Sequence, residues 1–219
     1  MKAIFAGLVR NCARSIDRTY ASIQEFGKHF DEYKTIVFTN DNEDNSIELL
    51  NKYPITILQE NLNWKKLTGV NLVRSRRLAH CRNQYLNEIL KYNFDYLIVL
   101  DWDLTKLPIN GFEKMLTEHA YVGSCGTQIY NKRTIMYDIW AYLPQGQRYF
   151  RAKITPIPKG KGLKPVQVCF GGLAVIRREF LIENMYAPMF RLCEHGGFCH
   201  SISSRGGSIF MNLDYRPER

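Results

Sequence analysis

The chain of 219 residues is long enough for one large domain with a substantial core, and its hydrophobic fraction of 45% and charged fraction of 23% are ordinary for a globular protein. No apolar run approaches the roughly 18 residues of a membrane span, and the N-terminal apolar run stops at Arg10, which argues against a signal peptide. The net charge of +9 favours an anionic partner such as a phosphate, a nucleic acid or an acidic surface, although a solvated basic face explains it equally well.

Apolar runs alternate with segments of helical periodicity along the first 130 residues. Strands that are apolar nearly throughout and alternate with helices are typical of a parallel sheet covered on both faces. We therefore expect an α/β fold with a mainly parallel central sheet. In chain order we expect a strand at 3–9, a helix at 15–30 with Ser15 as its N-cap, a strand at 34–40, a helix at 46–52, a strand at 55–59, a helix at 73–92, a strand at 95–100, a helix at 112–119 and a strand at 120–129.

The last third of the chain is less regular. It contains a basic stretch within 148–164, an apolar run at 166–176 that we expect to be a strand, and a last strand at 208–213. No compositional break marks a linker, so we expect a single domain over residues 1–219. An extra segment grafted at the carboxyl ends of the strands would be expected to hold a second substrate.

The strand at 95–100 ends in Asp101, Trp102 and Asp103, and polar residues also follow the three earlier strands, in LVRN, FTND and LQEN. In such sheets ligands bind beyond the carboxyl ends of the strands. Alternate residues of an extended segment point the same way, so the two carboxylates are expected to share a cation. Hard oxygen ligands suit Mg²⁺ or Mn²⁺. An isolated D-x-D is common by chance, and its place after a buried strand is what favours a metal site.

The helix at 73–92 carries Arg74, Arg76, Arg77 and Arg82 near its start. A guanidinium fork matches phosphate or ribose oxygens. At least two of the four are expected to be simply exposed, and Arg77 and Arg82 are the stronger candidates because they flank the apolar stripe.

Two further patterns allow more than one interpretation. Gly171 and Gly172 interrupt an apolar run, which indicates either a close approach of ligand or backbone or a plain bulge. Four aromatic residues are candidates for stacking on a sugar, although aromatic residues more often belong to the core. They are Trp64, Tyr137, Trp140 and Tyr142.

The segment CEHGGFCH concentrates Cys193, Glu194, His195, Cys199 and His200 in eight residues. A structural zinc site normally uses separated pairs of ligands, so we do not favour zinc here. Glu194 as a base or an acceptor contact, with His195 or His200 completing a metal shell, fits better. The alternative is a capped helix with two ordinary histidines.

Together these motifs resemble the nucleotide-sugar glycosyltransferases of the GT-A fold. The resemblance is carried by GLVRN at the first strand, FTND after the second, RRLAHCRN on a helix and YLIVLDWD. FGGLAVI together with CEHGGFCHSI is more particular and resembles the fungal capsule-associated mannosyltransferase family and related enzymes of large DNA viruses. The resemblance spans residues 3–213. It implies a Rossmann-like GT-A fold in which about 1–130 bind the nucleotide sugar and about 131–219 hold the acceptor and the catalytic groups.

The resemblance also implies roles for the matching positions. Asp101 and Asp103, with His195, would bind Mn²⁺ or Mg²⁺ at the donor's two phosphates. If the enzyme inverts the sugar configuration, Glu194 would deprotonate the acceptor, with Asp214 as the reserve. The residues expected to hold the nucleotide and its sugar are Gly7, Val9, Arg10, Asn40, Asp41, Arg77, Arg82, Trp102, Gly171 and Gly172.

We therefore expect a metal-dependent glycosyltransferase that moves a hexose or deoxyhexose to a glycan or glycoprotein, with a UDP-sugar the first donor to test and GDP-mannose the second. A nucleotidyltransferase shares the topology, but LVRNCARS lacks its glycine-rich loop. A nucleic-acid-binding protein would explain the charge, but its standard motifs are missing. A non-catalytic carbohydrate-binding module is the remaining alternative.

The six scattered cysteines and the lack of a secretory signal predict reduced thiols and a cytoplasmic location. Many eukaryotic relatives in the resembling families carry an N-terminal membrane anchor, which this chain lacks. We therefore expect either a cytosolic enzyme or the catalytic part of a longer protein.

Overall fold

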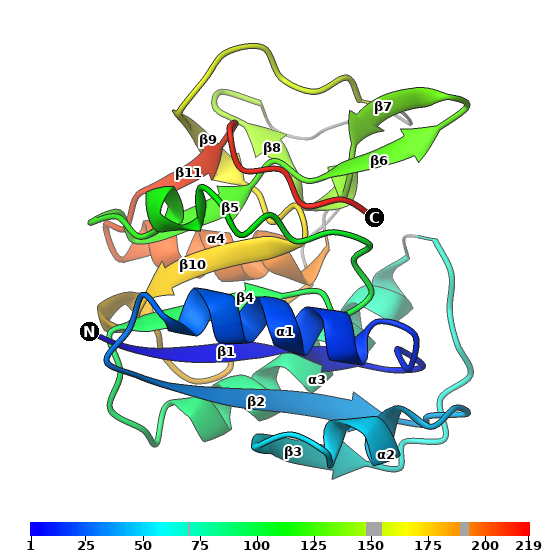
Figure 1. Ribbon diagram of the computed structural model, residues 1–219. Helices are drawn as coiled ribbons and strands as arrows, with labels where there is room; N and C mark the ends of the chain where they lie inside the picture. The colour runs from blue at the N-terminus through cyan, green and yellow to red at the C-terminus, as the bar shows by residue number, and fades with distance from the viewer. Residues whose placement is uncertain (70, 148–154, 189–192) are drawn as a thin grey trace.

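The computed structural model describes residues 1–69, 71–147, 155–188 and 193–219. Its main feature is a mixed, mainly parallel sheet with helices on both faces, which confirms the expected α/β fold class (Figure 1). Along the sheet the strand order is β3-β2-β1-β4-β10-β5-β11-β9-β8, and β6 pairs with β7 in a separate hairpin. The strands are β1 (Lys2–Val9), β2 (Glu32–Asn40), β3 (Ile55–Glu60), β4 (Tyr96–Leu100), β5 (Tyr121–Ser124), β6 (Thr127–Tyr130), β7 (Arg133–Met136), β8 (Leu143–Pro144), β9 (Leu163–Val168), β10 (Leu173–Arg177) and β11 (Ile209–Asn212).

The half of the sheet formed by β3, β2, β1 and β4 is entirely parallel. β10 runs antiparallel to β4 and to β5, while β11 is parallel to β5. The centre of β1 is buried from Ala3 to Ala6 because both faces of the sheet are covered. The carboxyl ends of β1, β2 and β4 therefore meet at one edge, which is where the polar strand ends lie.

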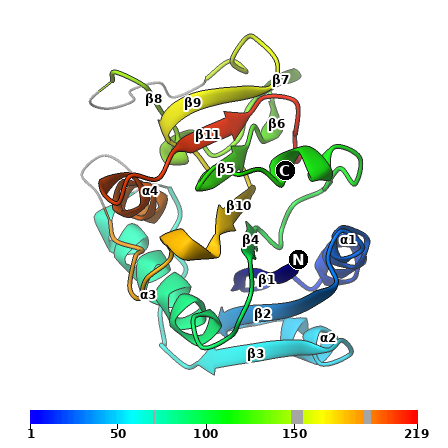
Figure 2. The ribbon, with the colours of Figure 1, turned by 90° about the vertical axis from the view of Figure 1, so that its left-hand side faces the viewer.

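The two faces of the sheet are covered by different helices. The helices α1 and α2 lie on one face, and α3 and α4 lie on the other (Figure 2). Each face has its own buried hydrophobic cluster, as a doubly covered sheet requires. The helices are α1 (Ile16–Gly27), α2 (Ser46–Leu50), α3 (Leu72–Ile89) and α4 (Glu194–Ser204), with short 3₁₀ turns η1 (Phe112–Met115), η2 (Ile139–Ala141) and η3 (Arg178–Phe180).

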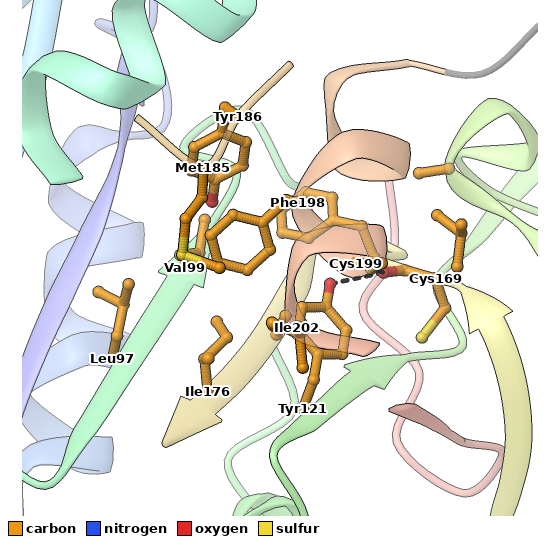
Figure 3. Close-up of a cluster of buried hydrophobic side chains, with 14 of the residues drawn as sticks. Leu97, Val99, Tyr121, Cys169, Ile176, Met185, Tyr186, Phe198, Cys199 and Ile202 are labelled. Atoms are coloured by element: carbon orange, nitrogen blue, oxygen red, sulfur yellow. Dashed lines mark hydrogen bonds between the residues drawn. The ribbon is translucent and has the colours of Figure 1, made fainter. Parts of the chain in front are cut away.

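The packing of α4 fixes where its first residues lie. Phe198, Cys199 and Ile202 are fully buried against side chains of β4, β5 and β10 (Figure 3). The ring of Phe198 stacks on Tyr186, with 4.3 Å between centroids. Because this face of α4 is held so closely, the N-terminal residue Glu194 is positioned firmly beside the end of β4.

The expected helix at 112–119 is wrong: only the single 3₁₀ turn η1 forms. After Met115 the chain becomes extended at Leu116. The hydroxyl of Thr117 then accepts a hydrogen bond of 3.2 Å from the amide of His119. Such local side-chain bonds compete with a helical backbone, which explains the early end.

The apolar runs at 120–129 and 166–176, each expected to be one strand, are each two strands. Both breaks occur where Gly126 and Gly171 pack together. Gly171 has a φ of +64° and Gly172 a φ of +91°, which turn the chain out of the extended conformation. A Cβ on Gly126 would lie 2.1 Å from the carbonyl oxygen of Gly171, so this contact requires glycine.

Ser15 stands immediately before α1, as expected, but its side chain does not cap the helix. Its hydroxyl instead donates to the carbonyl oxygens of Cys12 and Trp102. The residue therefore ties the start of α1 to the segment that follows β4.

The glycine contact leads to a prediction about stability. In Gly171→Ala the new Cβ would lie 2.2 Å from the carbonyl oxygen of Ser124 at a left-handed φ. We expect a loss of about 2 to 4 kcal/mol in the free energy of unfolding, measured by urea denaturation. Gly146→Ala is the matched control, since Gly146 has a φ of +75° but nothing within 4 Å. It should cost only about 1 kcal/mol, and equal losses would contradict the steric explanation.

Candidate functional site

A cavity of about 280 Å³, which we call the main cavity, lies where β1 and β4 end. Charged side chains of both signs line it. The basic ones are Arg10, Lys66, Arg74, Arg82 and Arg219, and the acidic ones are Asp101, Asp103, Asp138 and Glu194. A polar, concave site of this kind at the carboxyl edge is where ligands of α/β sheets bind.

A second cavity of about 170 Å³, which we call the side cavity, adjoins the main one. Val9 and Asn40, at the ends of β1 and β2, line it. Arg77 lies over the ring of Trp64 at 5.0 Å from the centroid, and its Nη1 donates to the Lys65 carbonyl at 3.0 Å. The side cavity therefore offers an aromatic ring, an amide and a fixed guanidinium, and four of the residues expected to hold a nucleotide line it: Val9, Arg10, Asn40 and Arg77.

Three basic side chains lie in the wall that the two cavities share: Arg10, Lys66 and Arg74. Arg10 donates to the Trp64 carbonyl at 2.8 Å, and its Nε is buried without a hydrogen-bond partner. Within the described ranges none of the three forms an ion pair with a carboxylate. Positive charge without a protein partner is what an anionic ligand requires.

Asp41 lies outside both cavities, and its contacts are with the protein backbone. Its carboxylate accepts hydrogen bonds from the amides of Leu62, Asn63 and Trp64 at 2.9 to 3.1 Å. Burial raises the pKa of Asp41, but these bonds and one from the Asn40 side chain outweigh it and hold that pKa below its usual value. Asp41 therefore orders the loop that carries Trp64 into the side cavity.

Asp101 and Asp103 both line the main cavity, although not for the reason expected from the sequence. The chain turns at Trp102 and Asp103 rather than continuing as a strand. Asp101 accepts a hydrogen bond of 2.9 Å from the Tyr137 hydroxyl, and Asp103 pairs with Arg219 at 2.6 Å. Burial, and then the charge of Asp103, raise the pKa of Asp101 to about 6. Burial and repulsion by Asp103 thus both disfavour the charged form of Asp101.

Arg82 is the buried centre of the charge network. Its Nε donates to Glu194 at 3.0 Å, and its Nη2 lies 3.7 Å from Asp101. The rings of Phe170 and Tyr186 lie on the guanidinium at 5.3 and 5.7 Å. The structure therefore gives Arg82 a structural partner on α4, and its guanidinium also lines the main cavity.

His195 and Glu194 form the part of the cavity wall given by α4. The His195 ring stacks on Phe170 at 4.0 Å between centroids. Burial, with the charge of Arg82, holds the pKa of His195 well below its usual value, so the ring is neutral. Glu194 Oε2 and His195 Nε2 are buried without hydrogen-bond partners. Buried polar atoms without partners are rare in folded proteins, and these two belong to residues that line the main cavity.

The structure does not assemble the metal shell expected around these histidines. His200 is exposed and lines a different groove. In the described parts of the chain no three His, Cys, Asp or Glu side chains gather as a metal-binding group, so neither His195 with the two aspartates nor the zinc alternative at Cys193 forms such a set. The cysteines are all free and buried.

Asp138 is an acidic residue of the main cavity that sequence reasoning missed. Burial first, and then the charges of Asp101 and Glu194, raise the pKa of Asp138 to about 7. Its backbone is left-handed, with φ 56° and ψ 45°. The available signal was one acidic residue within the aromatic run YDIWAY. Lys66 and Arg219 were also missed, and no motif marked either of them.

The predicted glycines have packing roles rather than places in the cavity walls. A Cβ on Gly7 would lie 2.6 Å from the ring of Trp102. Trp102 lines the main cavity but is only 1% exposed, and its Nε1 has no hydrogen-bond partner. Gly171 packs on the backbone of Ser124, and Gly172 faces the Leu104 side chain. Asp214, the reserve base, is exposed outside the main cavity and accepts from the Gly162 amide at 2.9 Å.

The four aromatic candidates divide between the cavities and the core. Trp64 lines the side cavity, and Trp140, 42% exposed, lines the main one with Tyr137. Tyr142 belongs to the buried cluster on the α3 and α4 face. Only Trp140 therefore presents a largely accessible ring to the main cavity.

The Arg82–Glu194 pair leads to a prediction about stability. Arg82→Met leaves a carboxylate that is 2% exposed without its counter-charge, at an expected cost of about 3 to 5 kcal/mol in urea unfolding. The double variant with Glu194→Gln should recover more than half of that loss. Arg219→Met is the control: its pair with Asp103 is nearly half exposed and should contribute at most about 1 kcal/mol. Equal losses in the two single variants would contradict this.

No protein-family model matches the chain, and no curated protein sequence matches it. The narrower resemblance to the capsule-associated and viral enzymes therefore stays a prediction. No helix in the described ranges is both long and apolar enough to cross a membrane.

Solved structures are similar over nearly the whole chain. A mannosyltransferase from Pyrobaculum calidifontis in complex with GDP-mannose and Mn²⁺ is 13% identical, with a TM-score of 0.55 over 99% of this chain and 56% of that one. TarS 1–349 of S. aureus in complex with UDP is 13% identical, with a TM-score of 0.58 over 100% and 60%.

GalNAc-T7 with UDP, GalNAc and Mn²⁺ is 12% identical to the chain, with a TM-score of 0.60 over 100% of this chain and 44% of that one. The chain thus spans no more than 60% of the length of these three structures. Structural similarity at such low sequence identity establishes the fold alone. The chain has the GT-A fold of nucleotide-sugar glycosyltransferases.

Proposed function

We propose that the chain is a metal-dependent glycosyltransferase that moves a hexose or deoxyhexose from a nucleoside-diphosphate sugar to a glycan or glycoprotein. The observation that carries the proposal is the carboxylate pair Asp101 and Asp103 in a cavity whose shared wall holds unpaired basic side chains. A diphosphate with a bound cation matches both kinds of charge at once. The GT-A fold is consistent with this use of the strand ends.

A divalent cation fits the aspartate pair by its chemistry. Oxygen ligands suit Mn²⁺ and Mg²⁺, and the two carboxylates line one cavity, where burial first and then the charge of Asp103 raise the pKa of Asp101 to about 6. When bound, such an ion would stabilise the negative charge of the departing nucleoside diphosphate. The neighbours that contain Mn²⁺ support the proposal by analogy.

The side cavity is the proposed place of the nucleoside. Val9, Asn40 and Arg77 would contact the base and ribose beside the Trp64 ring. Arg10 and its basic neighbours in the shared wall would then face the diphosphate, where charge-assisted hydrogen bonds are strongest. UDP remains the first nucleotide to test and GDP the second, since the neighbours include structures with UDP and with GDP-mannose.

The main cavity is the proposed place of the transferred sugar and the acceptor. Glu194 and His195 line this cavity, and each has one buried polar atom without a hydrogen-bond partner, Oε2 and Nε2, to which a sugar hydroxyl is chemically matched. Trp140 offers an exposed ring on which an acceptor sugar can stack. In this arrangement Glu194 binds substrate while Arg82 holds it in position.

The proposal is tested by calorimetric titration of UDP and GDP with and without Mn²⁺. We expect one nucleotide to bind in a Mn²⁺-dependent way, and Asp103→Asn to weaken that binding about tenfold or more. Asp214→Asn, a matched change of a carboxylate outside the main cavity, should bind as the original chain does, and thermal melting should show both variants folded.

Failure of both nucleotides to bind would contradict the proposal. So would tight binding that ignores Mn²⁺ and Asp103. Sugar binding without nucleotide would instead favour a carbohydrate-binding module, and salt-sensitive binding of DNA without metal would favour a nucleic-acid-binding protein.

A further inference from the structure

Asp138 stands apart from the other carboxylates of the main cavity. Asp101 is bonded to Tyr137, Asp103 to Arg219 and Glu194 to Arg82. In the described part of the structure the Asp138 carboxylate forms no hydrogen bond or ion pair, although it lines the same cavity. It is therefore available to a ligand.

The backbone holds Asp138 in place without help from its side chain. The amide of Tyr137 donates to the Gly126 carbonyl at 2.8 Å, and the Tyr137 hydroxyl donates to Asp101. The Asp138 carbonyl accepts from the Ala141 amide at 3.0 Å, which closes the turn η2. The bonds of Tyr137 and of the Asp138 carbonyl thus fix the backbone of Asp138 on both sides of its side chain.

The conformation of Asp138 is unusual for a residue with a side chain. Its φ of 56° and ψ of 45° lie in the left-handed region, where most residues other than glycine pay a cost of about 1 to 2 kcal/mol. Asparagine and aspartate tolerate this region best. Asparagine would serve the turn equally well, so the turn alone does not account for a negative charge at this position.

We propose that Asp138 is the general base of the transfer reaction and accepts the proton of the attacking acceptor hydroxyl. This inference rests on the glycosyltransferase function proposed above. The acceptor oxygen forms a bond to the anomeric carbon, and the bond from that carbon to the phosphate oxygen breaks. The hydroxyl proton moves to an Asp138 oxygen, and the nucleoside diphosphate leaves with the bonding electrons.

Glu194 is less suited to this step. It is 2% exposed and its Oε1 is bonded to a permanent cation, Arg82, which stabilises its charged form. Asp138 is only half-buried and has no such partner. Asp138 lines the main cavity without a bonded cation, and burial first, then the charges of Asp101 and Glu194, raise its pKa to about 7 against the opposing charges of Arg82 and Arg74.

A base in this position implies a direct displacement and therefore inversion at the anomeric carbon. In a direct attack the acceptor and the leaving phosphate occupy opposite sides of that carbon. Asp138 comes from the segment before η2, whereas the proposed phosphate-binding residues Arg10, Lys66 and Arg74 come from the end of β1, the loop after β3 and the start of α3. The stereochemistry of the product is thus a second, independent readout.

The test uses water as the acceptor, because the natural acceptor is not identified. The chain and its variants are incubated with Mn²⁺ and, in turn, UDP-glucose, UDP-N-acetylglucosamine, UDP-N-acetylgalactosamine and GDP-mannose. Release of UDP or GDP gives kcat and KM, and early proton NMR gives the anomeric configuration of the freed sugar. The variants are Asp138→Asn, which keeps the left-handed turn, and the control Asp17→Asn, which changes an exposed carboxylate on α1 outside both cavities.

We expect Asp138→Asn to lower kcat about 100-fold or more while the KM for the donor changes less than about threefold. Calorimetric binding of UDP or GDP should be retained, and the freed sugar should have inverted configuration. Asp138→Asn with normal kcat overturns the inference, and so does a product of retained configuration. If the original chain neither binds nor cleaves any donor, the proposed function itself fails, and nucleotide binding by the variant separates these two failures.

Discussion

The Arg82 guanidinium is the charge on which the arrangement of the acidic groups depends. It lies between Glu194 at the start of α4 and Asp101 at the end of β4, and it belongs to a third element, α3. Without that cation the two carboxylates would repel each other with little water to screen them, since Glu194 is 2% exposed. Phe170 and Tyr186 cover the guanidinium, which strengthens both attractions by excluding water. Arg82 therefore joins the two halves of the cavity wall.

Some of the remaining charged groups of the site have partners of opposite charge and others do not, and the groups without partners determine which ligand the site can bind. Asp103 has a half-exposed partner, Arg219, and Asp101 has Arg82 at 3.7 Å, yet burial first and then the charge of Asp103 raise the pKa of Asp101 to about 6. In the wall shared with the side cavity Arg10 and Lys66 form no ion pair within the described ranges. A ligand that brings both a cation and an anionic phosphate would correct both deficits together, whereas either alone would correct only one.

The sequence predicted the β1–β4 half of the sheet well, because buried parallel strands have continuous apolar runs with polar ends. It failed where contacts between distant segments decide the structure. The pairing of Gly126 with Gly171 split two apolar runs, and neither run shows that contact by itself. Asp138 was missed for a similar reason: its importance comes from neighbours on β4 and α4, while its local sequence is an ordinary aromatic run.

The glycines illustrate how such distant contacts act on the site. The carbonyl of Gly172 accepts the amide of Asp101 at 2.9 Å, and the carbonyl of Gly126 accepts the amide of Tyr137 at 2.8 Å. Gly126 and Gly171 also pack directly together. These backbone contacts of Gly126, Gly171 and Gly172 therefore align the end of β4 with the segment that contains Asp138. The glycine contacts thus fix the position of the aspartate pair relative to the proposed base, which catalysis by a positioned base requires. This accounts for the paired glycines without any contact to the donor sugar.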